Sequence, residues 1–338
     1  MRVLFLIQDS NLPSSRIRVV NLLSHLEKHN VIPFLAPYPK KLSDRLRLFQ
    51  KLPEFDAVYL QRKLITAPEL FILRRRAHRL LFDFDDAIYQ HDDSHPDPYS
   101  RTRQTRFQSI VRASDHVVVG NTILGDKLTP HDAGYSVIPS SVPVTNVPER
   151  EYSALNTRLR IGWVGTKGNF RYLETLRQPL LQLARDYPLE LRVVSNAPFH
   201  CDGIDVINIE WSAEQQEKEI AQFDIGVMPL SDTSWTRGKC GYKALQYMAS
   251  GVVPIVSDVG DNAAMVTHGC DGFKAANPAT FYDAMASLAA SPEQMRSMGI
   301  CAREKVKIHY SQEVIAERLA KVIHSVVHSS QYNQLSTR

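Results

Sequence analysis

The sequence predicts an α/β protein built from two doubly wound lobes, each with a parallel sheet covered by helices. Short apolar runs with the composition of buried strands alternate with amphipathic segments along the chain. This alternation occurs twice, over two stretches of similar length. The segment 143–157, PVTNVPEREYSALNT, contains prolines and no apolar periodicity, so the boundary between the two lobes is expected there.

Length and composition narrow the class further. The 338 residues suit two domains, and the formal charge of +4 allows an anionic ligand without the dense basic stripe of a nucleic-acid-binding protein. The four cysteines form no CxxC pair, which argues against zinc and for reduced thiols. No apolar run approaches the ~20 residues that span a bilayer. We expect a cytoplasmic protein; peripheral contact with the inner face of the membrane and the oligomeric state stay open.

The first half of the chain alternates strands with helices. The expected strands are apolar runs that end in polar loops, namely 2–7, 31–36, 56–60, 80–84, 115–120 and 135–138. The helices expected between them are 16–29, capped by Ser14 or Ser15, then 40–51, 70–79, 102–111 and 121–128. The basic residues of 40–51 and 74–79 indicate a solvated face, contact with an anionic membrane surface or contact with an anionic acceptor.

The loop after the first strand lacks a dinucleotide-binding motif. Residues 11–15 read NLPSS where a GxGxxG motif would stand, so a dinucleotide oxidoreductase is disfavoured. Arg16 and Arg18 follow near the start of the first helix, where arginines oppose the helix dipole. They indicate either an anionic ligand nearby or two solvated side chains.

The densest acidic group in the chain ends the strand 80–84. Asp83, Asp85 and Asp86, in FDFDDAI, resemble a metal-binding DxD motif or the opening motif of haloacid-dehalogenase-like phosphatases. Alternatively, they place one or two carboxylates over a crevice as substrate ligands or a general base. A structural role as helix caps also stays open. Several strands precede the motif, and Ala87 stands where those phosphatases usually have Thr or Val, so carboxylates at the crevice are favoured.

The second half restarts the alternation. Its expected strands are 159–164, 189–194, 206–209, 225–230 and 252–256. Its expected helices are 172–184, a helix capped by Ser212 and Gln215, then 242–250, 281–290, 292–308 and 312–328. The tail from Ser329 is polar and is expected to be frayed.

The stretch 224–262 carries the strongest binding signal. In Gly238-Lys239-Cys240-Gly241, glycines allow a ligand close to the backbone, and a helix is expected to begin near Tyr242. The free N–H groups of a helix start attract anions, and neighbouring lysines strengthen that attraction. Gly165-Thr166-Lys167 opens another helix and is a second candidate anion site. The alternative is an ordinary strand–helix unit with solvated lysines.

Several runs, in this order and spacing, resemble the GT-B glycosyltransferases of family 4, which use nucleotide-activated sugars. The most specific runs are IGWVGTKGNFRYLETL, FDIGVMPL, RGKCGYKALQYMASGVVPIVS, DVGDN and GFKAANP. ASDHVVVGN and VIPSSV are similar to the closing strands of the acceptor lobe in that family. The resemblance covers nearly the whole chain and implies the GT-B fold, with two Rossmann-like lobes facing a central cleft.

The resemblance also implies a division of labour. Residues 1–150 would form the acceptor-side lobe and 151–312 the donor lobe, with a helix in 313–338 crossing back to the N-terminal lobe. Basic side chains and helix N-termini would hold the donor diphosphate, with no obligatory metal or cofactor. The implied donor contacts are Gly165, Thr166, Lys167, Asn196, Trp211, Arg237, Lys239, Gly241, Tyr242, Lys243 and Gln246.

The chain departs from the family at one pair of positions. The family commonly carries two Glu eight positions apart, on the donor sugar and the ribose, where this sequence has Gly238 and Gln246. Gln can still hydrogen-bond a ribose hydroxyl, but Gly cannot replace a carboxylate. Asp85 or Asp86 would then supply the carboxylate, as acceptor base or sugar ligand, and both join Lys239 as expected catalytic residues. The departure leaves the donor and the retaining or inverting outcome open.

Three functions follow from these features. The leading hypothesis is a glycosyltransferase that moves a sugar from a UDP-, GDP- or dTDP-linked donor to a hydroxyl of a glycan, lipid-linked or small-molecule acceptor. Lys167, Lys239 and the helix start at Tyr242 would stabilise the departing diphosphate. One alternative is a Mg²⁺-dependent phosphohydrolase built on FDFDD. The other is a GT-B protein that binds a nucleotide sugar or a glycan without turnover.

Overall fold

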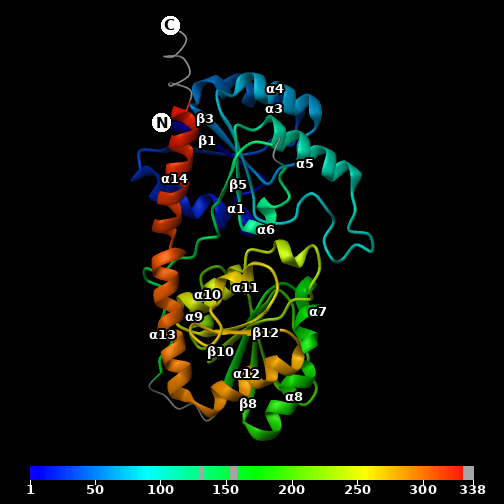
Figure 1. Cartoon of the computed structure of the whole chain (residues 1–338), viewed down its shortest axis with the longest axis vertical. Helices are drawn as coiled ribbons and strands as arrows, with labels where there is room; N and C mark the ends of the chain where they lie inside the picture. The colour runs from blue at the N-terminus through cyan, green and yellow to red at the C-terminus, as the bar shows by residue number, and fades with distance from the viewer. Residues whose placement is uncertain (130–131, 153–157, 330–338) are drawn as a thin grey trace. The chain divides into compact units, whose positions relative to one another are not determined.

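The structure is a computed structural model that describes residues 1–129, 132–152 and 158–329. The chain divides into two compact units (Figure 1). The N-terminal unit comprises Met1–Ser141, Arg237–Cys240 and the segment from Gln312 onward, and the C-terminal unit comprises Val142–Thr236 and Gly241–Ser311. The tail after residue 329, for which fraying is predicted, lies outside the described residues, as does part of the linker 143–157.

The N-terminal unit is built on a parallel sheet with the strand order β2-β1-β3-β4-β5-β6. Its strands are β1 (Arg2–Ile7), β2 (Ile32–Pro37), β3 (Ala57–Gln61), β4 (Leu80–Phe84), β5 (His116–Val119) and β6 (Tyr135–Val137). Its helices are α1 (Pro13–Arg18), α2 (Leu23–Glu27), α3 (Leu42–Lys51), α4 (Ala67–Arg76), α5 (Arg101–Ala113), α6 (Thr122–Gly125) and α14 (Gln312–His328). The strand order reverses between β1 and β3, which is where sheets of this type bind ligands.

Helix α14 completes the core of the N-terminal unit although it comes from the end of the chain (Figure 1). Its buried residues Ile315, Leu319 and Ile323 share one hydrophobic cluster with Leu22 and Leu26. These apolar positions recur at a spacing of four residues, so they form a single stripe along the helix. Burial of this stripe attaches the end of the chain to the N-terminal unit.

The helix expected over 16–29 is interrupted in the structure. It begins earlier, at Pro13, because proline suits the first turn of a helix. It ends at Arg18, since Val19 adopts φ −131° and ψ −66°, and a 3-10 turn leads on to α2. The predicted serine cap is wrong, because Leu12 is the N-cap residue and no side chain caps the helix.

The C-terminal unit has a second parallel sheet, with the strand order β12-β11-β10-β7-β8-β9. Its strands are β7 (Leu159–Val164), β8 (Leu189–Ser195), β9 (Asp205–Glu210), β10 (Ile225–Met228), β11 (Val253–Ser257) and β12 (Phe273–Ala275). Its helices are α7 (Phe170–Leu173), α8 (Arg177–Asp186), α9 (Gln216–Ile220), α10 (Tyr242–Ala249), α11 (Asp261–Met265), α12 (Pro278–Ala290) and α13 (Pro292–His309). The order reverses between β7 and β10, and the predicted α/β fold class is confirmed. None of the helices within the described ranges is long and apolar enough to cross a membrane.

Two strand glycines leave room for aromatic rings that pack on this sheet. A Cβ on Gly226 would lie 2.4 Å from the ring of Tyr247, and a Cβ on Gly162 would lie 1.9 Å from the ring of Phe223. Side chains at these strand positions would therefore displace both rings. The Tyr247 hydroxyl accepts a hydrogen bond from the backbone N–H of Val164, with 3.1 Å between the heavy atoms. Helix α10 is thus held directly to the end of β7.

Candidate functional site

The Gly165 loop and the start of α10 meet inside the C-terminal unit, whereas Gly238, Lys239 and Cys240 of the other predicted anion-binding segment belong to the N-terminal unit. A Cβ added to Gly165 would lie 2.3 Å from the ring of Trp163 and 2.9 Å from Nζ of Lys243. The Lys243 ammonium therefore lies beside the backbone of the loop that follows β7. It also lies 4.7 Å from the centroid of the Trp163 ring, which holds it by a cation–π contact. The fold thus brings the Gly165 loop and the first turn of α10 to one edge of the sheet.

The loop after Gly165 is shaped by a side chain from the neighbouring strand. The backbone N–H of Lys167 donates to Oδ1 of Asn196, which follows β8, with 2.9 Å between the atoms. Thr166 and Lys167 are exposed. The expected helix 172–184 is broken into short segments, because a continuous helix would place Pro179 in its interior. Its last part, α8, begins at Arg177 and carries this proline in the first turn.

Helix α10 starts with no side-chain cap. Gly241 is its N-cap residue and adopts φ 57°, a left-handed conformation that favours glycine. A Cβ there would lie 2.6 Å from Cε of Met265 and 3.0 Å from Oδ1 of Asn262, so the position also lacks space for a side chain. Tyr242 and Lys243 form the first turn. The N–H groups of that turn make this edge of the sheet suitable for an anion.

Asn262 is a site residue that the sequence does not single out. Its side chain is 1 % exposed, and neither Oδ1 nor Nδ2 has a hydrogen-bond partner among the described residues. Gln246 is 4 % exposed, and its Nε2 likewise has no partner within the described part of the chain. A buried unpaired polar group costs about 1–3 kcal/mol, and a ligand that hydrogen-bonds to these atoms would offset that cost.

The remaining residues predicted for donor binding lie at separate places. Trp211 follows β9 and is 37 % exposed, and its indole Nε1 donates to Oε1 of Gln216, with 2.9 Å between the atoms. Arg237 is exposed and lies in a 3-10 turn (Thr236–Gly238), and its contacts, like those of Lys239, belong to the N-terminal unit. Within the C-terminal unit, the structure brings Asn196 to the Gly165 loop and that loop to the start of α10.

In the N-terminal unit, the three carboxylates after β4 separate into two environments. Asp83 is fully buried and forms an ion pair with Arg18, which is also buried. Arg18 additionally donates to the carbonyl oxygen of Ile138. Neither explanation predicted for Arg18, an anionic ligand or solvation, is correct. Because Asp83 is enclosed by protein, it cannot act as the nucleophile of the phosphohydrolase alternative.

Asp85 and Asp86 remain partly accessible and face Arg62. The side chains of the two aspartates are 12 % and 22 % exposed, and their oxygens lie 3.3 Å and 2.7 Å from Nη1 of Arg62. Burial raises the pKa of Asp86, whereas the positive charges of Arg62 and Lys239 oppose that rise. The structure thus brings together all three residues predicted to be catalytic. The sequence does not single out Arg62. This residue adopts a left-handed backbone conformation (φ 58°), which the residue pattern does not reveal.

The packing around Gly238 explains why no glutamate stands there. A Cβ at this position would lie 3.1 Å from Leu124 and 3.2 Å from the Cβ of Ala87. The backbone carbonyl of Gly238 accepts a hydrogen bond from Nδ2 of Asn121, with 3.2 Å between the atoms. Cys240 in turn donates from Sγ to the carbonyl oxygen of Asp85 at 3.1 Å. This loop is therefore packed tightly on the acidic site, and a longer side chain would disturb it.

Asp261, at the start of α11 and next to Asn262, provides a pH-dependent test of the C-terminal unit. Burial raises the pKa of its carboxyl from 3.8 to about 7. The folded state therefore favours the neutral acid, and its stabilising effect is full below pH 3.8 and is lost as the pH rises towards 7.

We expect Asp261→Asn, which resembles the neutral acid, to raise the melting temperature relative to the wild type. The gain should grow from about pH 4 to about pH 7 and then level off. Thermal melts over this range measure it. Asp258→Asn, at an exposed aspartate three residues earlier, controls for the lost charge. A melting-temperature difference that does not vary with pH would contradict burial as the cause.

No group of three or more His, Cys, Asp or Glu side chains within the described ranges is arranged to hold a metal ion. The carboxylate nearest to Asp85 and Asp86 in the sequence, Asp83, is occupied by Arg18. The Arg62 guanidinium contacts both carboxylates, and the positive charge of Lys239 also acts on Asp86.

Comparison with known proteins agrees with this architecture. Residues 160–291 match the family described as Glycosyl transferases group 1. No curated protein sequence matches the chain. Among solved structures, sucrose-phosphate synthase from Thermosynechococcus elongatus is 14 % identical with a TM-score of 0.76, covering 97 % of this chain and 100 % of that one.

Two further structures have the same fold. HepE from Anabaena, solved in complex with UDP, is 14 % identical with a TM-score of 0.71, and the match covers 96 % of this chain and 100 % of HepE. A glycosyltransferase from Rickettsia africae is 11 % identical with a TM-score of 0.71, and the match covers 97 % of this chain and 98 % of that protein. At such low identity these likenesses establish a shared fold, the two-unit GT-B architecture.

Proposed function

From the GT-B fold of the chain, and because residues 160–291 match glycosyl transferases group 1, we propose that the protein is a glycosyltransferase. It transfers a sugar from a nucleotide-sugar donor to a hydroxyl of a glycan, lipid-linked or small-molecule acceptor. The observation that carries the proposal is the position of the Lys243 ammonium beside Gly165, at the uncapped start of α10.

The donor diphosphate is assigned to the C-terminal unit. A diphosphate at the start of α10 would receive hydrogen bonds from backbone N–H groups of its first turn, and Lys243 and Lys167 would neutralise its charge. Both polar side-chain atoms of Asn262 and Nε2 of Gln246, which have no partner among the described residues, support a polar ligand here. Asn196 and Trp211, after β8 and β9, are proposed to contact the nucleoside.

In the N-terminal unit, the proposed catalytic residues are Asp85, Asp86 and Lys239. Asp85 or Asp86 acts as the base that removes a proton from the acceptor hydroxyl, and Arg62 holds both carboxylates in place. Lys239 and the neighbouring Arg237 stabilise the negative charge that develops on the departing nucleoside diphosphate. These lysine and arginine side chains supply the role that a divalent metal would otherwise have, so we propose that no metal is required.

Release of nucleoside diphosphate from UDP-, GDP- and dTDP-sugars tests this assignment. We expect the purified protein to hydrolyse at least one donor slowly without acceptor, and EDTA should not change the rate. Thermal shifts with the same donors identify the preferred base. A donor that raises the melting temperature without being turned over would indicate the non-catalytic alternative, and no shift with any donor would contradict the proposal.

A further inference from the structure

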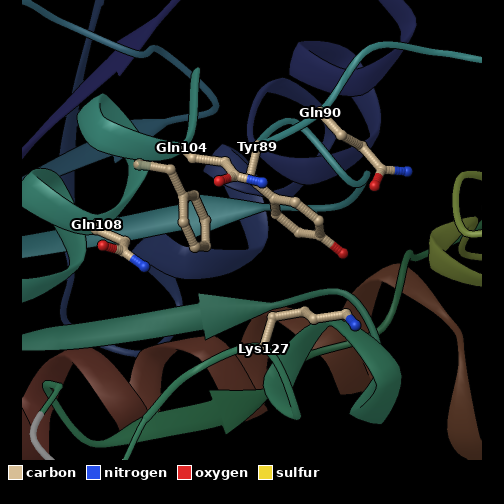
Figure 2. A pocket seen from close by; sticks show the side chains of 6 residues that line it. Tyr89, Gln90, Gln104, Gln108 and Lys127 are labelled. Carbon is tan, nitrogen blue, oxygen red and sulfur yellow. The ribbon is translucent and has the colours of Figure 1, made fainter. Parts of the chain in front are cut away.

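The N-terminal unit has a pocket that none of the predicted site residues explains. Its volume is about 290 Å³, near the lower end of the range for small-molecule sites, so it suits one or two sugar rings better than a large ligand. The loop after β4, one face of α5 and the turn after α6 contribute its walls. The lining residues are Tyr89, Gln90, Gln104, Phe107, Gln108 and Lys127 (Figure 2).

The aromatic wall of this pocket is rigid. Phe107 is 4 % exposed and packs edge-on against Tyr89, with 5.2 Å between the ring centroids and 60° between the planes. On its other side, Phe107 contacts Phe84 of β4 at 5.0 Å and 86°. The Tyr89 ring is therefore braced by the sheet through Phe107, and it can present a fixed apolar surface without ordering on binding.

Three polar side chains of the lining, Gln104, Gln108 and Lys127, are available to a ligand. Gln104 and Gln108 are one turn apart on α5, and neither side-chain amide has a hydrogen-bond partner among the described residues. Lys127 forms no ion pair with any residue in the described ranges. Burial raises the pKa of Tyr89 to about 12, so its hydroxyl stays protonated and can donate a hydrogen bond.

We infer that this pocket binds an acidic sugar residue of the acceptor glycan. The C–H face of a sugar ring can stack on Tyr89, and the amides of Gln104 and Gln108 each offer two donors and an acceptor to neighbouring hydroxyls. Lys127 is the charged side chain in the lining, and α5 carries Arg101, Arg103 and Arg106 without an acidic residue, which favours a carboxylate-bearing sugar.

The inference rests on the proposed function, but it can fail separately. Sugar binding is measured without any nucleotide, by saturation-transfer NMR on the full chain with methyl glucuronide and methyl glucoside. Donor hydrolysis is measured without any acceptor. Loss of sugar binding with intact hydrolysis would overturn the pocket assignment alone, whereas sugar binding without hydrolysis of any donor would remove the transferase proposal.

We expect methyl glucuronide to bind, with its axial ring protons receiving the strongest saturation, and to bind about fivefold more tightly than methyl glucoside. Lys127→Gln should abolish that preference, and Gln108→Ala should weaken the binding of both sugars. Tyr89→Ala should abolish binding, whereas Tyr89→Phe, which keeps the ring, should retain most of it. Tyr99→Ala changes an exposed tyrosine outside the pocket and should have no effect.

Three results would overturn the inference. The first is that methyl glucuronide receives no detectable saturation, and the second is that the wild type binds the two sugars equally well. The third is that UDP displaces methyl glucuronide because UDP itself contacts Tyr89. Circular dichroism shows whether Tyr89→Ala is still folded. If this variant is unfolded, the effect of Gln108→Ala on sugar binding tests the pocket assignment in its place.

Discussion

Lys239→Ala should lower kcat for donor turnover by about 10² to 10³, because it removes a positive charge proposed to stabilise the departing diphosphate. The fold should be unchanged, since Lys239 is half-buried on a loop rather than in the core. Lys51→Ala, at an exposed lysine at the end of α3, is the matched control and should leave turnover unaffected. Activity equal to the wild type in Lys239→Ala would exclude the proposed role of this residue.

The same variant has a second signature in its pH profile. Lys239 opposes the rise that burial causes in the pKa of Asp86, so its removal should raise that pKa further. A base must be ionised to act, so activity increases as the pH rises through the pKa of the base. The residual activity of Lys239→Ala should therefore begin at a higher pH than in the wild type. If kcat/KM rises over the same pH range in both proteins, Asp86 is not the base.

The buried ion pair of the N-terminal unit should give the largest effect on stability. Arg18→Met should lower the free energy of unfolding by about 3–5 kcal/mol, because it leaves the Asp83 carboxylate buried without its partner. Arg47→Met breaks an exposed pair with Asp44 and should cost less than about 1 kcal/mol. Urea unfolding measures both.

The double variant Arg18→Met/Asp83→Leu distinguishes charge from packing. Replacing both charges with apolar side chains removes the unpaired carboxylate, so most of the lost stability should return. A double variant as unstable as Arg18→Met alone would show that the loss comes from altered packing. It would also weaken the view that Asp83 has a structural role distinct from Asp85 and Asp86.

Local patterns predict most of the fold. Runs such as LLFDF at 80–84 are apolar and bounded by polar loops, and they form strands because a doubly covered parallel sheet requires such runs. The first helix shows where local reasoning fails. Its apolar spacing continues past Val19, but the backbone there leaves the helical region, and a 3-10 turn follows.

The sequence predicts which segments form the site, but it does not predict which residues contact one another. The glycines and lysines around Gly165 and Gly241 indicate anion binding from composition alone. The approach of Lys243 to Gly165, across 78 positions, depends on how α10 packs on β7. Likewise, Arg18 meets Asp83 across 65 positions, a contact that the tertiary fold alone creates.

Asn262 marks the limit of pattern-based prediction more clearly. An asparagine in a polar loop is ordinarily solvated, and nothing in DVGDN distinguishes it from its neighbours. Only its burial beside Gly241, with both polar atoms unpaired among the described residues, identifies it as a candidate ligand contact.

Calorimetric titration of UDP-glucose, GDP-glucose and dTDP-glucose into the full chain tests the central claim, a nucleoside diphosphate site at the start of α10. We expect the wild type to bind at least one donor. Lys243→Met should lower the affinity for that donor at least about tenfold, because a charge-assisted contact is lost, whereas Lys127→Gln should leave the donor affinity unchanged. Equal donor affinity in the wild type and Lys243→Met, or no binding of any donor to the wild type, would contradict the account.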